Sequence, residues 1–431
     1  MINAAKCLTS SKFVRNVAIV ATGTAGAQAI TMAFAPIITR LYGPEAFGVF
    51  GIYTAILAVL TPLSALSYPT AIVLPKRDAD AMKLVRLSIG VALGMTLLAA
   101  LILLLFKDSI VSAFNLHAVD SFILLLPLAM LFSAAMGVMN QWIIRKKQFK
   151  IKAKVAVLQA LWINLAKAGI GFFTPIAAVL VFIATAGSAL HALMLWANIR
   201  KNPEAGMSKS DVDSIEDEAS ITSLAWRHRD FAYYRTPQVV LNAASKSLPV
   251  LMLASFFGPA PAGFYALGKL VLGIPTTLIG QSVAAVFYPR INEAVLNGES
   301  PYKLLIKATA ALAVVGVLPF ATVIAFGPWL FSFVFGQEWY TAGVYAQWLA
   351  LWSYFGFINR PSVGAIPVLS LQGFFLAYEI MSIGIRAGSL FLGFLMFESA
   401  LIAVALFSLS SAGLNLFLII ATFVAAKRYK D

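Results

Sequence analysis

The sequence predicts an all-α polytopic membrane protein, with about twelve transmembrane helices in two repeated six-helix bundles around a central cavity. The chain of 431 residues is 60% hydrophobic with a mean hydropathy of +0.86, and only 12% of its residues are charged, whereas soluble domains carry roughly 25%. Apolar runs of about 20 residues, long enough to cross a bilayer, recur along the whole chain. An internal repeat predicts the division into two bundles.

The predicted spans follow one another closely and have approximate edges. They cover residues 16–39, 46–74, 84–106, 120–144, 153–173, 175–199, 236–257, 262–288, 304–326, 341–371, 374–397 and 399–426. The tenth contains Arg360-Pro361, so two short spans are an alternative there. We expect an N-terminal bundle over 1–200, a connector over 201–235 and a C-terminal bundle over 236–431. The connector begins as a polar linker and ends in an apolar and aromatic stretch that could lie on the inner membrane face.

Two turns of the chain share one pattern. Aromatic, Gly, Pro, Gly and aromatic residues recur at a constant spacing in residues 42–50 and 257–265, each between two apolar runs. Duplicated membrane chains are typical of transporters that bind substrate between their halves. Gly and Pro allow sharp reversals, so we expect a structural role in the outer turns for the shared residues, which are Gly43, Pro44, Gly48, Gly258, Pro259 and Gly263.

Basic residues gather in alternate loops, and this sets the predicted orientation. Residues 76–86, 145–154 and 427–430 are rich in Lys and Arg, whereas the loops between them on the other side are poor in both. Cytoplasmic loops carry such an excess, so both termini are expected in the cytoplasm. The same pattern accounts for the net charge of +14, and we expect no nucleic-acid partner.

Several other classes of protein are disfavoured by what the sequence contains. Cys7 is the only cysteine, and the three histidines are scattered, so no metal or disulfide site is expected. No glycine-rich phosphate loop ending in Lys-Ser or Lys-Thr occurs, and no pair of carboxylates suggests sugar transfer. We therefore expect a transporter with no cofactor and no catalytic residues, not an enzyme. His191 is expected to be a packed, hydrogen-bonded residue.

Charged residues inside the predicted spans are the main functional signal. The basic residues are Lys167, Lys246, Lys269, Arg360 and Arg386, and Glu379 is the one carboxylate well within a span. Such groups are costly in hydrocarbon and usually face water or a partner, so this excess predicts an electropositive cavity for an anionic ligand. Alternatively, Lys269 extends to the membrane interface, and Arg360 or Arg386 pairs with Glu379.

Polar residues at spacings of three and four extend the same helix faces. The predicted polar lining comprises Gln28, Thr31, Asn164, Gln238 and Asn242. Transport without ATP needs an ion gradient or a membrane potential, and Glu379 or Asp120 could carry a coupling proton. A structural ion pair is an equal alternative for Glu379.

Several segments together resemble the polysaccharide flippases of the multidrug/oligosaccharidyl-lipid/polysaccharide exporter superfamily. They include residues 38–50, 248–251, 257–267, 281–283, 286–289, 326–328 and 334–346. The resemblance implies two six-helix bundles that open alternately to each side of a bacterial cytoplasmic (inner) membrane. The implied cargo is an oligosaccharide on undecaprenyl pyrophosphate. By this resemblance, the residues expected to shield the pyrophosphate are Lys246, Arg386, Arg360, Lys167 and Lys269.

Other functions remain open at this point. A multidrug exporter of the same superfamily would need a carboxylate deep in the N-terminal half, where Asp120 at a helix edge is the nearest candidate. A membrane polysaccharide polymerase would need a large outer loop, whereas the longest loop is predicted inside. A scaffold in a glycan assembly complex is a further alternative. The glycan could belong to capsule, O-antigen of lipopolysaccharide, exopolysaccharide or a teichuronic-type polymer. We expect a monomer in the lipid bilayer, with a polymerase or an assembly complex as candidate partner.

Overall fold

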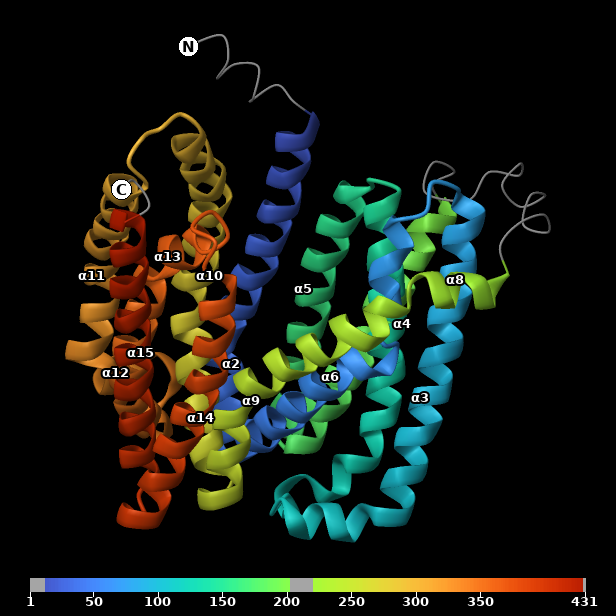
Figure 1. Cartoon of the computed structure of the whole chain (residues 1–431). Coiled ribbons are helices and arrows are strands. Elements are labelled where there is room, and N and C mark those ends of the chain that lie inside the picture. The colour runs from blue at the N-terminus through green and yellow to red at the C-terminus, as the bar shows by residue number, and fades with distance from the viewer. Residues whose placement is uncertain (1–11, 202–219, 429–431) are drawn as a thin grey trace. The chain divides into compact units, whose positions relative to one another are not determined.

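The computed structural model describes residues 12–201 and 220–428, and side chains there except at 12–17, 275, 277–286, 289 and 296. These residues form helices joined by short turns, and the described ranges contain no strand (Figure 1). The predicted all-α fold is confirmed. Residues 1–11 of the predicted N-terminal bundle and 202–219 of the predicted connector lie outside the described ranges.

The chain divides into two compact units. The first takes in the described residues up to Tyr42 and those from Val49 to Leu251, and the second comprises Gly43–Gly48 and the residues from Met252 onward. The first unit is built from α2 (Lys12–Ser64), η1 (Tyr68–Val73), α3 (Asp78–Ala113), η2 (His117–Leu125), α4 (Leu126–Arg145), α5 (Phe149–Phe173), α6 (Ala177–Lys201), α8 (Ile221–Arg227), the π-helical η5 (Phe231–Arg235) and most of α9 (Thr236–Phe257).

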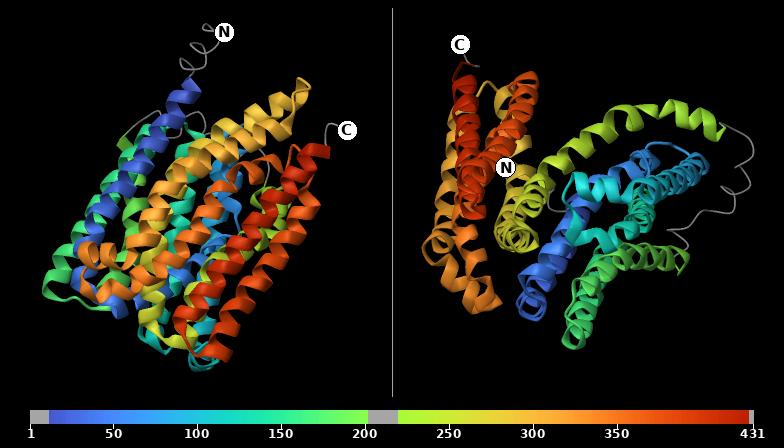
Figure 2. Two further views of the ribbon diagram at one scale, coloured as in Figure 1. Left: turned by 90° about the vertical axis from the view of Figure 1, so that its left-hand side faces the viewer. Right: turned by 90° about the horizontal axis from the view of Figure 1, so that it is seen from below.

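The second unit contains seven further elements. They are α10 (Pro259–Leu296), α11 (Pro301–Phe335), η6 (Gln337–Trp339), α12 (Tyr340–Ile358), α13 (Arg360–Ala365), α14 (Gln372–Phe397) and α15 (Ala400–Arg428). Helix α12 packs on α10, α11 and α15, and α15 also packs on α14 (Figure 2). In the first unit, α4 packs on α3 and α6, and α5 packs on α6.

Nine helical segments within the described ranges are long and apolar enough to cross a membrane. The first predicted span and most of the second lie in α2, which is broken at Gly43, where φ is 66°. The tenth predicted span is one helix, α12, followed by the short α13 and a turn. Because six residues of α13 rise only about 9 Å, that helix is too short for a span of its own. The total of twelve spans stays a prediction.

The two repeated turns pack against each other within the second unit. Gly43 and Gly258, which precede the repeated prolines, both have positive φ, at 66° and 86°. A methyl group at Gly48 would overlap the carbonyl oxygen of Pro259, and one at Gly263 would overlap the carbonyl oxygen of Pro44. The contact is therefore reciprocal, and each turn needs the glycine of its own copy because the backbone of the other copy occupies the space.

An aromatic cluster covers this contact. Phe47, Phe264 and Trp339 meet edge to face, with the rings of Phe47 and Phe264 lying 5.5 Å and 6.1 Å from the ring of Trp339. Trp339 is only 1% exposed. Aromatic rings in this arrangement attract beyond the area they bury, so the cluster stabilises the paired turns.

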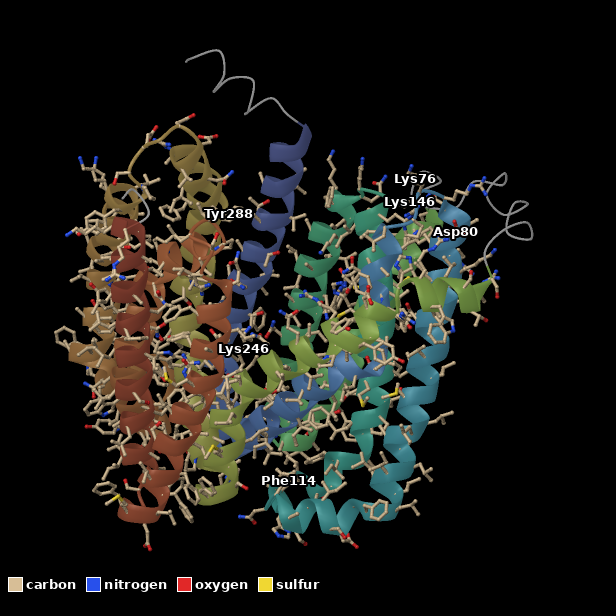
Figure 3. The ribbon with its side chains drawn as sticks, viewed as in Figure 1. Lys76, Asp80, Phe114, Lys146, Lys246 and Tyr288 are labelled. Carbon is tan, nitrogen blue, oxygen red and sulfur yellow. The ribbon has the colours of Figure 1, made fainter. Side chains whose placement is uncertain are left out.

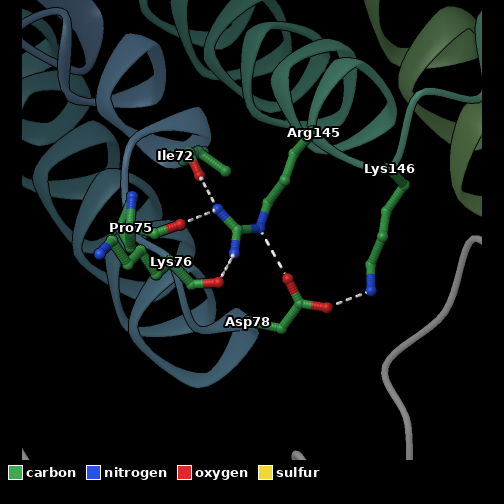
Figure 4. A network of polar contacts seen from close by, with 6 residues as sticks. All are labelled: Ile72, Pro75, Lys76, Asp78, Arg145 and Lys146. Atoms are coloured by element: carbon green, nitrogen blue, oxygen red, sulfur yellow. Dashed lines mark hydrogen bonds and ion pairs between the residues drawn. The ribbon is translucent and has the colours of Figure 1, made fainter.

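A charged network fixes one end of the first unit (Figure 4). The Arg145 guanidinium donates hydrogen bonds to Asp78 at 2.8 Å and to the carbonyl oxygens of Ile72, Pro75 and Lys76 at 3.2, 2.6 and 3.3 Å. Lys146 forms an ion pair with the other carboxylate oxygen of Asp78. Arg145 thereby satisfies backbone acceptors at the end of η1 and joins α4 to the start of α3.

Replacing the repeat glycines by alanine will destabilise the second unit. We expect Gly48→Ala and Gly263→Ala each to cost about 1–3 kcal/mol, as overpacked positions do, and to lower the thermal unfolding temperature in detergent. Gly413→Ala on α15 is the matched control, because nothing lies within 4 Å of a methyl group there. Equal unfolding temperatures for the Gly263 and Gly413 variants would contradict the packing of the two turns.

Removing the charge of Asp78 will loosen the same end of the first unit. We expect Asp78→Asn to cost about 2 kcal/mol, since it weakens hydrogen bonds to two charged partners. Asp108→Asn, an exposed position on the same helix, is the control. Thermal unfolding that does not distinguish the two variants would show that the network contributes nothing to stability.

Candidate functional site

The five basic residues predicted inside spans are divided between the two units. Lys167 and Lys246 belong to the first unit, and Lys269, Arg360 and Arg386 belong to the second. Each unit is described by its own contacts below.

Lys167 on α5 is held over an aromatic ring of α2. It is half-buried, and its Nζ lies 4.4 Å from the centroid of the Phe50 ring. The Tyr42 hydroxyl donates a hydrogen bond of 2.8 Å to the Lys167 carbonyl oxygen. Gly171, one turn further along α5, leaves room for the Tyr42 ring, because a methyl group there would lie 2.5 Å from a ring carbon. An ammonium group over a ring face is stabilised where water is scarce.

Lys246 lies midway along α9 and is exposed (Figure 3). Asn242 and Gln238, about one and two turns earlier, are also exposed, so the predicted polar face of α9 is present. Gln238 accepts a hydrogen bond of 3.2 Å from Arg235. This face stays open within the first unit, as a ligand-facing surface requires.

Two predicted lining residues bind each other. The Asn164 amide donates to Thr31 Oγ1 at 3.3 Å and to the Ala160 carbonyl oxygen at 2.7 Å. Asn164 is 4% exposed; one amide hydrogen joins α5 to α2, and the other is bonded within α5. Gln28, one turn before Thr31, is half-buried.

Lys269 and Arg386 converge on one tyrosine in the second unit. Lys269 Nζ lies 5.9 Å from the centroid of the Tyr265 ring, and the charge of Arg386 on α14 interacts with both Tyr265 and Tyr378. The Tyr265 hydroxyl and Arg386 Nε are both buried, with no hydrogen-bond partner among the described residues. Buried polar atoms in native proteins are usually paired, so these two mark a place where water or a ligand supplies the missing partners.

The surroundings of this pair are rigid. Tyr265 packs edge-on against Phe407 of α15 at 6.1 Å, and Phe407 packs against Trp352 of α12 at 5.1 Å. Ser389 donates to the Arg386 carbonyl oxygen at 2.9 Å and accepts from Ser410 at 3.1 Å, which ties α14 to α15 beside the guanidinium.

Arg360 and Glu379 lie apart from this arrangement. Arg360 is exposed at the break between α12 and α13, where a buried hydrogen bond of 3.0 Å between Asn359 and Asn415 fixes the bend. Glu379 is half-buried on α14, and its charge interacts with Tyr378. Among the described residues Glu379 forms no ion pair with Arg360 or Arg386.

Asp120 forms an ion pair with Lys107. The two charged atoms are 3.0 Å apart, and both side chains are partly exposed. The pair joins α3 to η2 near the end of α3 that lies opposite Asp78.

One polar network of the first unit was missed by sequence reasoning. His191 Nδ1 and Gln159 Oε1 are 2.6 Å apart, Asn140 lies 3.4 Å from His191 Nε2, and Gln159 donates to the Gly187 carbonyl oxygen at 2.9 Å. The expectation that His191 is packed and hydrogen-bonded is confirmed. Polar residues in the apolar runs of α4 and α5 were a signal for Asn140 and Gln159, but their spacing along the chain gave no sign that they meet.

The sequence of this chain matches a known protein family. The profile of a family described as "Polysaccharide biosynthesis protein" matches residues 37–343, which is well over half of the chain. No curated protein is similar enough in sequence to count as a match.

Solved structures share the fold at low identity. An inward-facing multidrug resistance MATE family transporter of the MOP superfamily matches with a TM-score of 0.74 and 12% identity, over 94% of this chain and 95% of that chain. The lipid II flippase MurJ in an inward closed conformation matches with a TM-score of 0.70 and 12% identity, over 95% and 90%. An outward-facing MATE transporter of the MOP superfamily gives a TM-score of 0.59 and 12% identity, over 96% and 95%. The chain therefore has the fold of MOP-superfamily transporters, and it belongs to the family of polysaccharide biosynthesis proteins.

Proposed function

We propose that this protein flips an oligosaccharide linked to a lipid pyrophosphate, such as undecaprenyl pyrophosphate, from the inner to the outer leaflet of a bacterial cytoplasmic membrane. The movement serves the synthesis of a surface polysaccharide. The protein acts as a transporter and forms no covalent intermediate with its cargo. Membership of a polysaccharide biosynthesis family and the shared fold with a lipid II flippase support this proposal.

The convergence of Lys269 and Arg386 on Tyr265 carries the proposal. A pyrophosphate cannot cross hydrocarbon unless cations replace its water. Arg386 offers a buried Nε donor without a protein acceptor, and the Tyr265 hydroxyl offers a second donor beside it. Arginine binds phosphate oxygens through parallel N–H donors, and lysine binds them as a point charge. Together these groups supply charge and directed hydrogen bonds to one anion.

The cations of the first unit have a complementary role in this proposal. Lys167 is preorganised over Phe50, and Lys246 is exposed on a polar helix face. In this proposal both residues supply positive charge for the pyrophosphate, whereas the sugars need only polar side chains. Of the five basic residues, Arg360 has the least support as a ligand of the pyrophosphate, because it lies at an exposed bend.

Export of cationic drugs is the second candidate, because multidrug transporters share the fold. An exporter of organic cations would use a carboxylate in the first unit. Asp120 is the candidate from the sequence, and it is paired with Lys107. The surplus of cations in the spans also favours an anionic cargo.

Neutralising the convergent cations will impair transport. In proteoliposomes loaded with a pyrophosphate-linked oligosaccharide, we expect Lys269→Gln and Arg386→Gln each to slow flipping roughly tenfold or more, because a hydrogen bond to a charged group contributes about 1.5–3 kcal/mol. Arg386→Lys should recover part of the rate, since charge remains while the guanidinium geometry is lost.

The matched control is Lys303→Gln, which removes one exposed positive charge from the start of α11 and should leave the rate unchanged. If the double variant of Lys269 and Arg386 flips the oligosaccharide at the unaltered rate, the proposed cationic site is wrong. Faster export of a cationic dye than of the oligosaccharide by the unaltered protein would favour the second candidate.

We further propose that Glu379, rather than Asp120, couples transport to protons. Glu379 lies on the helix of Arg386 without an ion pair in the described structure, whereas Asp120 is paired with Lys107. We expect Glu379→Gln to abolish the response of flipping to an imposed pH gradient and Asp120→Asn to preserve it. The reverse pattern, measured in the same vesicles, would assign coupling to Asp120.

A further inference from the structure

The end of the connector is built into the first unit. Leu224 of α8 is 1% exposed and packs with buried residues of η1, α3 and α4, among them Ala71, Leu84 and Trp142. The Tyr68 hydroxyl donates to the Ala225 carbonyl oxygen at 3.3 Å, and Thr236 donates to Ser67 at 3.0 Å. The segment 221–236 is thus held against η1 at both of its ends.

A basic pocket of about 390 Å³ lies between α8 and the turn that joins η1 to α3. Its lining residues are Leu74, Pro75, Lys76, Arg77, Asp80, Leu224, Arg227 and His228. Lys76 and Asp80 lie close together at this end of the unit in Figure 3. The volume suits a phosphate with a small alcohol better than a chain of several sugars.

The charge of this pocket is positive because the adjacent carboxylate is engaged elsewhere. Asp78 binds Arg145 and Lys146, so among the described lining residues Asp80 is the one carboxylate, beside Lys76, Arg77 and Arg227. Arg145 also holds the carbonyl oxygen of Lys76 (Figure 4), which fixes the turn. Burial and the neighbouring Arg227 lower the pKa of His228 below its ordinary value, so at pH 7 this imidazole is a neutral hydrogen-bonding group.

An apolar pocket of similar volume lies on the other side of α8. It is lined by Leu66, Tyr68, Ala225, Trp226, Arg229, Ala232 and Tyr233. Trp226 and Tyr233 are 63% and 69% exposed, and the Arg229 guanidinium lies 5.1 Å from the Trp226 ring. Leu224 and Arg227 of α8 line the basic pocket, and Ala225 and Trp226 line the apolar one, so this short helix contributes to both.

We propose that these two pockets bind one anionic phospholipid of the cytoplasmic leaflet, with its phosphate among Lys76, Arg77 and Arg227 and an acyl chain against Trp226 and Tyr233. The proposal rests on the predicted orientation, which places this end of the unit in the cytoplasm, and not on the identity of the cargo. Bound lipid would fasten the connector to the membrane surface beside the first unit.

Two features favour a lipid over a soluble phosphate. Exposed Trp and Tyr side chains are enriched at the level of lipid headgroups, and basic residues beside them are attracted to anionic lipid surfaces. A site for a soluble phosphate compound would have no use for the apolar pocket or for its exposed aromatic side chains.

Lipid retention by the purified full-length protein tests the proposal. The protein is placed in nanodiscs of phosphatidylglycerol and phosphatidylcholine, extracted in detergent, and analysed by native mass spectrometry. We expect the unaltered protein to retain phosphatidylglycerol in preference to phosphatidylcholine, and the double variant Lys76→Gln with Arg227→Gln to retain about tenfold less of it. The side chains of both residues are exposed, so the variant should fold.

Matched variants distinguish the effect of positive charge on lipid retention from the effect of apolar contact. The double variant Lys303→Gln with Lys307→Gln removes two charges from the second unit and should retain phosphatidylglycerol like the unaltered protein. Trp226→Ala should lower retention of both lipids while the preference for phosphatidylglycerol persists. Arg386→Gln should retain the lipid normally even where it flips oligosaccharide slowly, which keeps this proposal distinct from the proposed transport function.

Three results would overturn the proposal. They are equal retention of phosphatidylglycerol by the Lys76/Arg227 variant and the unaltered protein, equal retention of the two lipids by the unaltered protein, and displacement of phosphatidylglycerol by millimolar inorganic pyrophosphate. The last result would assign the basic pocket to a soluble phosphate compound.

Discussion

The cost of a charge in hydrocarbon is the constraint on which this structure depends. Well inside its predicted spans the chain keeps five basic residues and one carboxylate. One carboxylate cannot pair with all five, so other groups must help to stabilise these cations. The structure provides an aromatic ring for Lys167, and it gathers Lys269 and Arg386 around Tyr265. A protein that needed only stability would not retain such residues, because apolar side chains in the same places would be less costly.

Several other polar residues join helices to one another. Thr31 with Asn164, Asn359 with Asn415, and Gln159 with His191 do so by hydrogen bonds. Asp78, Arg145 and Lys146 do the same with charges at one end of the first unit. The Nε of Arg386 and the hydroxyl of Tyr265 are among the buried polar atoms that have no hydrogen-bond partner in the described structure, and the charge of Arg386 also interacts with Tyr265.

The fold class could be predicted from the sequence because hydropathy and repeat spacing are local properties of the chain. The spacing of Gly43 and Gly258 likewise predicted two similar turns, and both have positive φ. The reciprocal packing of Gly48 and Gly263 could not be predicted, since it depends on which surfaces meet in the folded chain. Similarly, helical spacing placed Asn164 on a polar helix face. The same spacing of polar residues occurs on a face that binds ligand and on one that packs against a neighbouring helix, so the sequence could not distinguish the two. The partner of Asp120 depended on the path of the turn after α3, which hydropathy does not specify.

We propose that this protein carries a lipid-linked oligosaccharide between leaflets. The distribution of that lipid between the two leaflets is the most direct test of this function. Cells depleted of the protein would be given labelled sugars, and the labelled lipid-linked oligosaccharide on each face of the membrane would be followed over time. We expect the labelled lipid-linked oligosaccharide to accumulate on the cytoplasmic face, with less glycan at the cell surface. An unchanged distribution, accompanied by greater sensitivity to cationic dyes, would contradict it and support drug export.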